Sequence, residues 1–133
     1  MTNQNLTIGR IGEDAAAELY LKHGFKILAR NYYNKKGKML GELDFVAIKN
    51  QHLHFVEIKT RTSEKFGMPE EALTKAKQAR IIRAAQFFLS ALPVFQKYQA
   101  HFDLVAVNLD IFDKSIKRIR IHSDAIDDLD EFN

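Results

Sequence analysis

The chain has 133 residues, of which 46% are hydrophobic and 28% are charged, and it contains no cysteine. This composition predicts a folded domain and excludes disulfides and thiolate metal sites, so a reducing cytoplasm is the expected location. We see neither a secretion signal nor a run of about 18 apolar residues, and therefore expect no membrane segment.

The formal net charge of +3 hides an asymmetry along the chain. Residues 124–133 contain five acids and no lysine or arginine, which leaves 20 basic and 12 acidic residues, a net charge of +8, in residues 1–123. We expect one domain over residues 1–123 and a short acidic tail over 124–133. A body this basic favours a polyanionic partner such as nucleic acid, although a solvated, lysine-rich surface has the same composition.

The first elements predicted in chain order are a helix and three strands. Residues 7–23 carry apolar side chains at helical spacing and end at Gly24, which is a natural helix stop. The strands are predicted over 25–33, 40–48 and 53–59, with a basic loop, NKKGK, over 34–38.

A second helix and two more strands follow. A loop over 63–71 precedes a helix that runs from about Thr74, an expected N-cap, to about Leu92. Strands over 101–109 and 116–122 complete the order α-β-β-β-α-β-β. This order predicts an α/β protein whose mixed β-sheet is flanked by a helix on each side.

The turn KNQH, residues 49–52, fixes how the second and third strands pair. In that register Val46 lies opposite Phe55, and Asp44 lands opposite Glu57. Because side chains alternate along a strand, the two acids project from the same face. The alternation adds Glu42 and Lys59 to that face and places Leu43, Phe45 and Ala47 on the other.

Two carboxylates that face each other on a covered sheet repel, and burial makes each ionised carboxylate less stable. One solution is a protonated carboxyl with a raised pKa. Another is a divalent cation such as Mg²⁺ between Asp44 and Glu57, with Lys59 beside it to pair with a phosphate or activate water. The alternative without a ligand is a salt-bridged hairpin, in which Lys59 pairs with Glu42 and Glu57 and Arg61 helps. We favour the cation, because the salt-bridged hairpin leaves Asp44 without a partner.

At these residues the sequence resembles known nucleases. The strings GELDFVAI (41–48) and FVEIKTR (55–61) resemble the PD-(D/E)xK nuclease signature. Together with GxxGE (9–13), EAxxxxKQ (71–78) and FDLVAV (102–107), they resemble the YraN-like family of predicted endonucleases, which are related to Holliday junction resolvases. The resemblance implies a restriction-endonuclease-like fold with an α-β-β-β-α-β core.

The resemblance also implies roles for residues at matching positions. Asp44 and Glu57 would be metal ligands for Mg²⁺ or Mn²⁺, with Glu13 of the first helix joining the metal site. Lys59 would be the catalytic lysine, and Gln78 would steady the site. The residue before Asp44 is a leucine where the general signature has proline.

The expected activity is hydrolysis of DNA phosphodiester bonds, on branched or damaged DNA, leaving a 3′-hydroxyl and a 5′-phosphate. Enzymes of this kind often act as homodimers. The alternative is a non-catalytic nucleic-acid-binding or interaction module that retains the nuclease fold. The residues expected to contact nucleic acid are Lys35, Lys36, Lys38, Arg61, Lys77 and Arg80.

Overall fold

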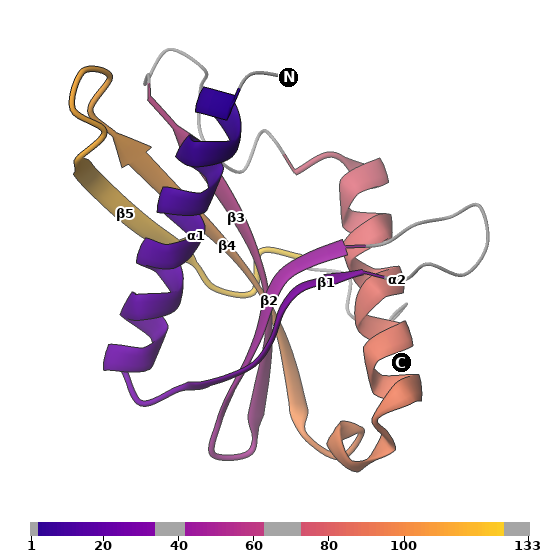
Figure 1. The fold of residues 1–133 in the computed structure, drawn as a ribbon. Coiled ribbons are helices and arrows are strands. Elements are labelled where there is room, and N and C mark those ends of the chain that lie inside the picture. Colours follow the sequence, from indigo (N-terminus) through magenta and orange to yellow (C-terminus); the bar gives the residue numbers. More distant parts are fainter. Residues whose placement is uncertain (1–2, 34–41, 63–72, 127–133) are drawn as a thin grey trace.

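The computed structural model describes residues 3–33, 42–62 and 73–126. The predicted order of two helices and five strands is confirmed, and a short 3-10 helix after the second helix was not predicted. The elements are α1 (Asn3–Lys22), β1 (Lys26–Tyr33), β2 (Glu42–Lys49), β3 (His52–Arg61), α2 (Lys75–Ala91), η2 (Pro93–Phe95), β4 (Gln99–Leu109) and β5 (Ile116–His122) (Figure 1).

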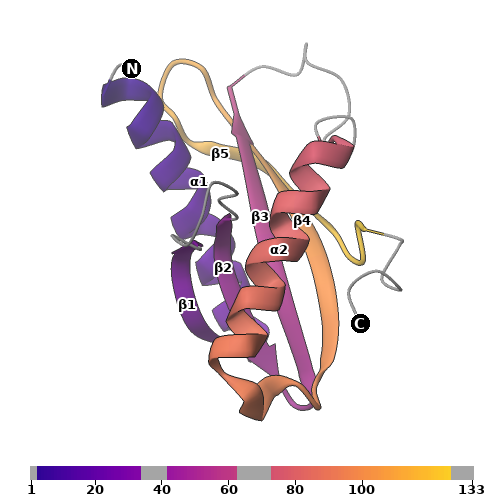
Figure 2. The same ribbon diagram turned by 90° about the vertical axis from the view of Figure 1, so that its right-hand side faces the viewer.

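The five strands form one mixed sheet in the order β1-β2-β3-β4-β5. Neighbouring strands are antiparallel except β3 and β4, which run parallel and are joined by α2 as a crossover helix. The helix α1 lies on one face of the sheet and α2 on the other (Figures 1 and 2). This architecture confirms the predicted α/β class and is consistent with a restriction-endonuclease-like fold.

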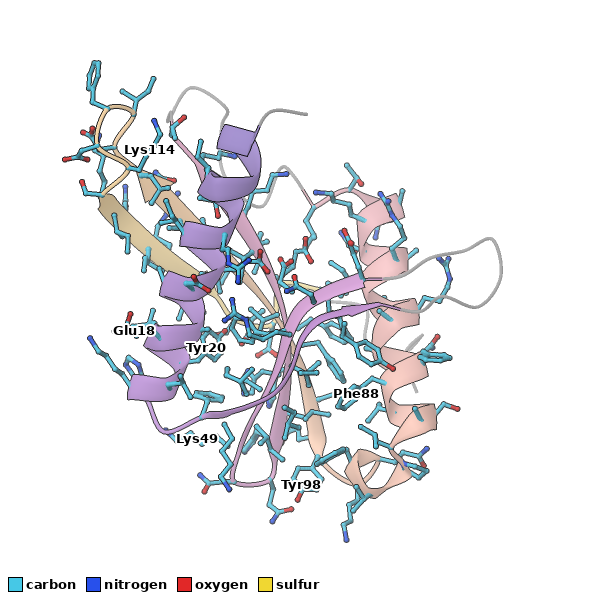
Figure 3. The ribbon with its side chains drawn as sticks, in the orientation of Figure 1. Glu18, Tyr20, Lys49, Phe88, Tyr98 and Lys114 are labelled. Atoms are coloured by element: carbon cyan, nitrogen blue, oxygen red, sulfur yellow. The ribbon has the colours of Figure 1, made fainter. Side chains whose placement is uncertain are left out.

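Each face of the sheet has its own hydrophobic core. Between α1 and the sheet, Tyr20 and Phe45 pack edge to face with ring centroids 5.0 Å apart. Between α2 and the sheet, Phe88 packs against Phe55 with centroids 5.9 Å apart. Tyr20 and Phe88 extend from their helices toward the sheet (Figure 3). Because both faces are covered, the central strands read as continuous apolar runs rather than as an alternating pattern.

The start of α2 is fixed by the predicted N-cap. The Thr74 hydroxyl accepts a hydrogen bond from the backbone N–H of Lys77 at 3.2 Å, and Thr74 itself is extended. At the other end of the helix the N–H of Leu92 donates to the Phe88 carbonyl, just before Pro93. The cap places Lys77 in the first turn of α2.

The register of the β2–β3 hairpin is as predicted, from Lys49 opposite His52 to Phe45 opposite Val56. The predicted face of Leu43 is wrong. Leu43 packs in the core beneath α2 together with Val46, whereas Phe45 packs beneath α1. The strict alternation of β2 therefore breaks between Leu43 and Phe45, directly beside Asp44.

The neighbouring strand β1 breaks its alternation at the same level. Arg30 forms an ion pair with Asp14 of α1 at 2.7 Å, yet Tyr32, two residues on, packs against Phe88 of α2. Asn31 between them has a positive φ of 52°, a conformation that asparagine tolerates better than most residues. Both strands thus rotate as they approach the candidate site.

The predicted loops over 34–38 and 63–71, with Lys35, Lys36 and Lys38, lie outside the described residues, as does most of the acidic tail. The first part of that tail packs on the body. The N–H of Ala125 donates to the Phe102 carbonyl at 2.7 Å, and Ile126 is buried in the core beneath α2. Among the described residues, no helix is both long enough and apolar enough to span a membrane.

Candidate active site

The candidate site lies where β2 begins, β3 ends and the first half of α1 crosses them. An open cleft of about 330 Å³ is present there. Gly12 allows α1 to approach β3 closely, because a Cβ at this position would lie 1.8 Å from Thr60 Oγ1. The cleft is lined by Ile8, Gly9, Glu13, Asp44, Ile58, Lys59 and Thr60.

Asp44 is held by the backbone of β3. Its Oδ2 accepts a hydrogen bond from the N–H of Ile58 at 2.5 Å. The β2–β3 ladder ends at Phe45 and Val56, so this side chain occupies the position of the next backbone partner. Burial raises the pKa of Asp44 to about 6, against the effect of this hydrogen bond, and the charges of Glu13 and Glu42 add to the rise.

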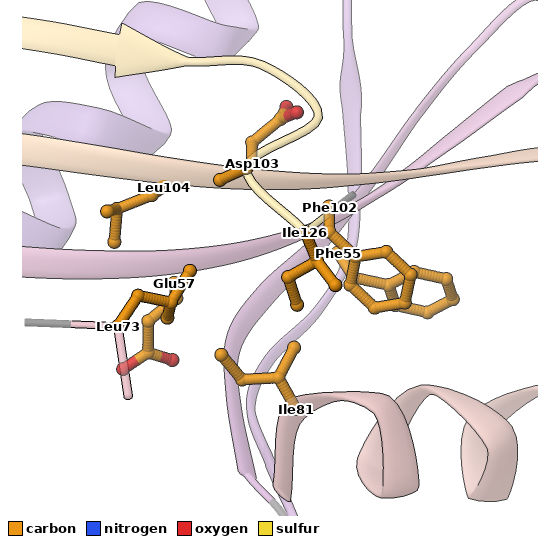
Figure 4. A pocket seen from close by; sticks show the side chains of 9 residues that line it. Phe55, Glu57, Leu73, Ile81, Phe102, Asp103, Leu104 and Ile126 are labelled. Atoms are coloured by element: carbon orange, nitrogen blue, oxygen red, sulfur yellow. The ribbon is translucent and has the colours of Figure 1, made fainter. Parts of the chain in front are cut away.

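Glu57 reaches the same region from β3 but is surrounded by apolar groups. It borders a small cavity of about 10 Å³, room for about one water. Its Oε2 is buried and has no hydrogen-bond partner among the described residues. Burial raises the pKa of Glu57 to about 8, and the charge of Asp44 contributes next. Figure 4 shows Glu57 with the apolar residues of the cavity, which are Phe55, Leu73, Ile81, Phe102, Leu104 and Ile126.

Glu13 supplies a third carboxylate, from α1. It lines the same cleft as Asp44, and its Oε1 is buried without a hydrogen-bond partner in the described part of the chain. Burial raises the pKa of Glu13, although Arg30 and Arg10 oppose the change. The charge of Glu13 thus raises the pKa of Asp44, and the charge of Asp44 raises the pKa of Glu57.

Two lysines border these acids. Burial lowers the pKa of Lys59, and the charge of Lys77 and a side-chain hydrogen bond to it lower the pKa further. The charge of Lys77 in turn lowers the pKa values of Asp44 and Glu57, although the net direction of both is upward. Lys77 was predicted only as a phosphate contact, but the structure brings it to the acids. The sequence signal was its place in the first turn of α2, next to Gln78.

The other predicted site residues are dispersed. The side chain of Gln78 donates to the Leu73 carbonyl at 3.0 Å, and so ties the start of α2 to the preceding segment. Arg61 ends β3 and is half-buried, while Arg80 is exposed on α2.

The three acids Asp44, Glu57 and Glu13 are called the acid cluster below. The cluster has the donor chemistry of a Mg²⁺ or Mn²⁺ site. Its ligands are hard carboxylate oxygens, and Glu13 and Glu57 each have one buried oxygen without a partner among the described residues. Within those same residues, no three histidine, cysteine or acidic side chains are arranged to enclose one ion. Mg²⁺ is commonly held by one or two carboxylates, with water and substrate phosphate completing the shell. The pair Asp44 and Glu57 fits that mode.

A second polar network lies on the α1 face. Asp103 interrupts the apolar strand β4 and is 4% exposed. Its Oδ2 accepts the Tyr20 hydroxyl at 2.8 Å and lies 2.7 Å from His54 Nδ1. The carboxylate of Asp103 points away from that of Glu57 (Figure 4), so this network joins α1 to the sheet and does not extend the acid cluster.

Fold and site together define an α/β protein of restriction-endonuclease-like architecture, with acids gathered where its central strands diverge. A family profile described as "Uncharacterised protein family UPF0102" matches residues 12–107. The chain belongs to this family, as its YraN-like motifs led us to expect.

The similarity to individual members covers most of each chain. A UPF0102 protein of Caldanaerobacter subterraneus is 40% identical over 104 residues, which is 78% of this chain and 81% of the relative. A UPF0102 protein of Clostridium perfringens is 39% identical over 111 residues, 84% and 87% of the two chains. One of Syntrophotalea carbinolica is 45% identical over 107 residues, 80% and 83%. These names describe no activity.

Proposed function

We propose that this protein is an endonuclease that uses Mg²⁺ or Mn²⁺ to hydrolyse DNA phosphodiester bonds. The observation that carries the proposal is the buried acid pair, Asp44 and Glu57. The pKa values of both acids are raised, the charges of Lys59 and Lys77 act on the pair, and Asp44 lines an open cleft. Such a pair is unfavourable in an empty site and becomes favourable when a divalent cation neutralises it. Perturbed acids in a cleft are typical of functional sites.

Each residue then has a role. Asp44 and Glu57 would hold the metal, and Glu13 would bind it directly or through water. A bound divalent metal supplies Lewis-acid stabilisation of the phosphate charge. Lys59, whose pKa burial lowers, accepts a proton from the attacking water. Water oxygen bonds to phosphorus, the bond to the 3′-oxygen breaks, and that oxygen takes up a proton. Lys77 places a positive charge near the scissile phosphate.

The substrate, the oligomer and the location belong to the same proposal. We propose branched or otherwise structured DNA as substrate, a homodimer that cuts two strands, and the cytoplasm as the site of action. The basic body of the chain supports a DNA partner.

A non-catalytic nucleic-acid-binding module is the second candidate. Two observations favour it. No three-ligand group is present among the described residues, and the Gln78 side chain bonds the Leu73 carbonyl instead of the acids. This candidate retains the basic surface and dispenses with the metal.

Calorimetric titration with Mn²⁺ and a cleavage assay separate the two candidates. Wild type should bind Mn²⁺, and Asp44→Asn should weaken binding at least about tenfold, because the loss of a residue that merely supports a metal ligand already costs about 10–100-fold. Glu18→Gln is the matched control, since Glu18 is exposed on α1 and extends away from the sheet (Figure 3). Lys59→Met should keep Mn²⁺ binding and lose cleavage of a four-way junction and of single-stranded DNA. Equal Mn²⁺ affinity in wild type and Asp44→Asn, or no cleavage by wild type, favours the non-catalytic module.

A further inference from the structure

The pairing registers bring arginines of the edge strand to the face of the sheet that carries Lys59. Across β3, β4 and β5, Lys59 is opposite Ala106, which is opposite Arg120. Two residues further along β3, Arg61 is opposite Asn108, which is opposite Arg118. Residues that pair across a sheet project from the same face. The four basic residues Lys59, Arg61, Arg118 and Arg120 are called the basic strip below.

We propose that the basic strip binds the phosphate backbone of DNA and sets its path across β3, β4 and β5, away from the acid cluster. This inference rests on the proposed function for its substrate. It adds Arg118 and Arg120, which no sequence motif indicated, and it fixes the direction in which the DNA extends.

The alternation of β5 explains why the arginines face this way. Ile119 packs against the core beneath α1, so Arg118 and Arg120, one residue to either side, point to the opposite face. Strands lie about 4.8 Å apart, which places β5 about 10 Å from β3. Between them, Ala106 and Asn108 are short side chains that leave space above the sheet.

The helix on this face leaves β5 uncovered. Among the described elements, α2 packs mainly over β2 and β3, and Figure 2 shows it crossing the sheet away from β5. Arg118 is exposed and Arg120 is half-buried. Neither guanidinium group has a hydrogen bond or an ion pair with another described residue. Guanidinium groups presented in this way match phosphate oxygens with two parallel hydrogen bonds.

The two arginines of the strip that lie on β5 have no acidic residue on their own strand. Between Ile116 and His122, β5 contains three lysine or arginine residues and no acid. The acids of the preceding turn are occupied by its backbone. Asp110 Oδ1 accepts the N–H groups of Phe112 and Asp113 at 2.8 and 3.1 Å, and Asp113 Oδ1 accepts that of Ser115 at 2.9 Å. A polyanion is therefore the partner that this edge suits.

Fluorescence anisotropy with labelled four-way junction DNA tests the proposal, in EDTA so that no cleavage occurs. The test variant is Arg118→Gln/Arg120→Gln. The control variant is Lys22→Gln/Lys97→Gln, which removes the same charge from two exposed lysines at the end of α1 and just after η2. Thermal unfolding of both variants checks that each is folded.

The arginine variant should bind on the order of tenfold more weakly at 0.1 M salt, and its slope of log affinity against log salt should fall by about 1.8. The control should change affinity less than about twofold. Equal losses in the two variants, or no DNA binding by wild type, overturn the proposal. A wild type that binds this DNA in EDTA but does not cleave it when Mn²⁺ is supplied contradicts the nuclease. The basic strip is then still decided by the same comparison of variants in EDTA.

Discussion

The carboxylate of Asp44 accepts the backbone N–H of Ile58 at 2.5 Å, at the point where β2 and β3 stop pairing. A side chain thus replaces a backbone carbonyl as the partner of β3. This contact fixes one acid beside the strand that carries Glu57 and Lys59. It explains why the charge of Asp44 acts on Glu57 although the ladder does not extend to them. The site forms where β2 and β3 diverge, whereas the register of the two strands is set by the turn at the other end of the hairpin.

Stability should fall as pH rises in the metal-free protein. The pKa of Glu57 is raised from 4.5 to about 8, so the folded state binds more protons than the unfolded state between those values. Unfolding free energy therefore decreases with pH over this window. Thermal unfolding in EDTA from pH 5 to 8 measures the trend.

Glu57→Gln should flatten that pH dependence. It should also raise stability at pH 8 by a few kcal/mol, since each pKa unit corresponds to about 1.4 kcal/mol. The exposed Glu18→Gln serves as control and should leave the slope unchanged. A metal-free wild type that becomes more stable toward pH 8 would contradict the buried, uncompensated acid.

The charge of Lys77 should lower the pKa values of Lys59, Asp44 and Glu57. Removing its charge with Lys77→Met should raise the pKa of Lys59, because Lys77 lowers it through charge and a hydrogen bond. The pKa values of Asp44 and Glu57 should rise further as well, since both lose an attractive cation. NMR titration of the Lys59 side chain and of the carboxyl carbons measures all three. Arg80→Met, an exposed change on the same helix, should leave them in place; if it shifts them equally, Lys77 has no specific role.

Gly12 should be intolerant of any side chain. Gly12→Ala places a methyl group in the volume of Thr60 and should cost about 1–3 kcal/mol of unfolding free energy as overpacking. Gly9→Ala, one helical turn earlier, meets nothing within 4 Å and should stabilise α1 by up to about 1 kcal/mol. Urea unfolding measures both. Thr60→Ala should recover part of the loss in Gly12→Ala, and additivity of the two changes would count against the contact.

The buried hydroxyl of Tyr20 should contribute to stability. Tyr20→Phe removes the hydrogen bond to Asp103 Oδ2 and leaves a carboxylate with fewer partners, at a cost of about 1–3 kcal/mol. Tyr98→Phe is the control, because the Tyr98 hydroxyl has no hydrogen bond to another described residue. Chemical denaturation of both proteins gives the difference. A Tyr20→Phe protein as stable as Tyr98→Phe would show that Asp103 is held by other groups.

Much of the fold could be predicted from the sequence because its signals are local. The turn at 49–52 determined the hairpin register, Thr74 marked the start of α2, and the apolar periodicity of each element gave the order of helices and strands. The face of Leu43 could not be predicted, since alternation was assumed to continue past Asp44. The break lies beside Asp44, which accepts a hydrogen bond from another strand, and no local pattern encodes that contact.

The candidate site was predictable in part for the same reason. Asp44 and Glu57 are related by a hairpin register, which is a short-range property. Lys77 reaches them from α2, and Arg118 joins the basic strip only through the parallel β3–β4 pairing and β5. Contacts between residues far apart in the sequence require the packing of whole elements, and no periodicity reports that packing.

The exposed turn at Asn50 and Gln51, far from the cleft, divides the chain between its acids. A chain cut there would leave Glu13 and Asp44 on one fragment, and Glu57, Lys59 and Lys77 on the other. Neither fragment holds all the charged residues of the site, and the pairing of β2 with β3 brings these residues together. Two such fragments, each inactive alone, would therefore bring the acids together again only when β2 of one fragment pairs with β3 of the other.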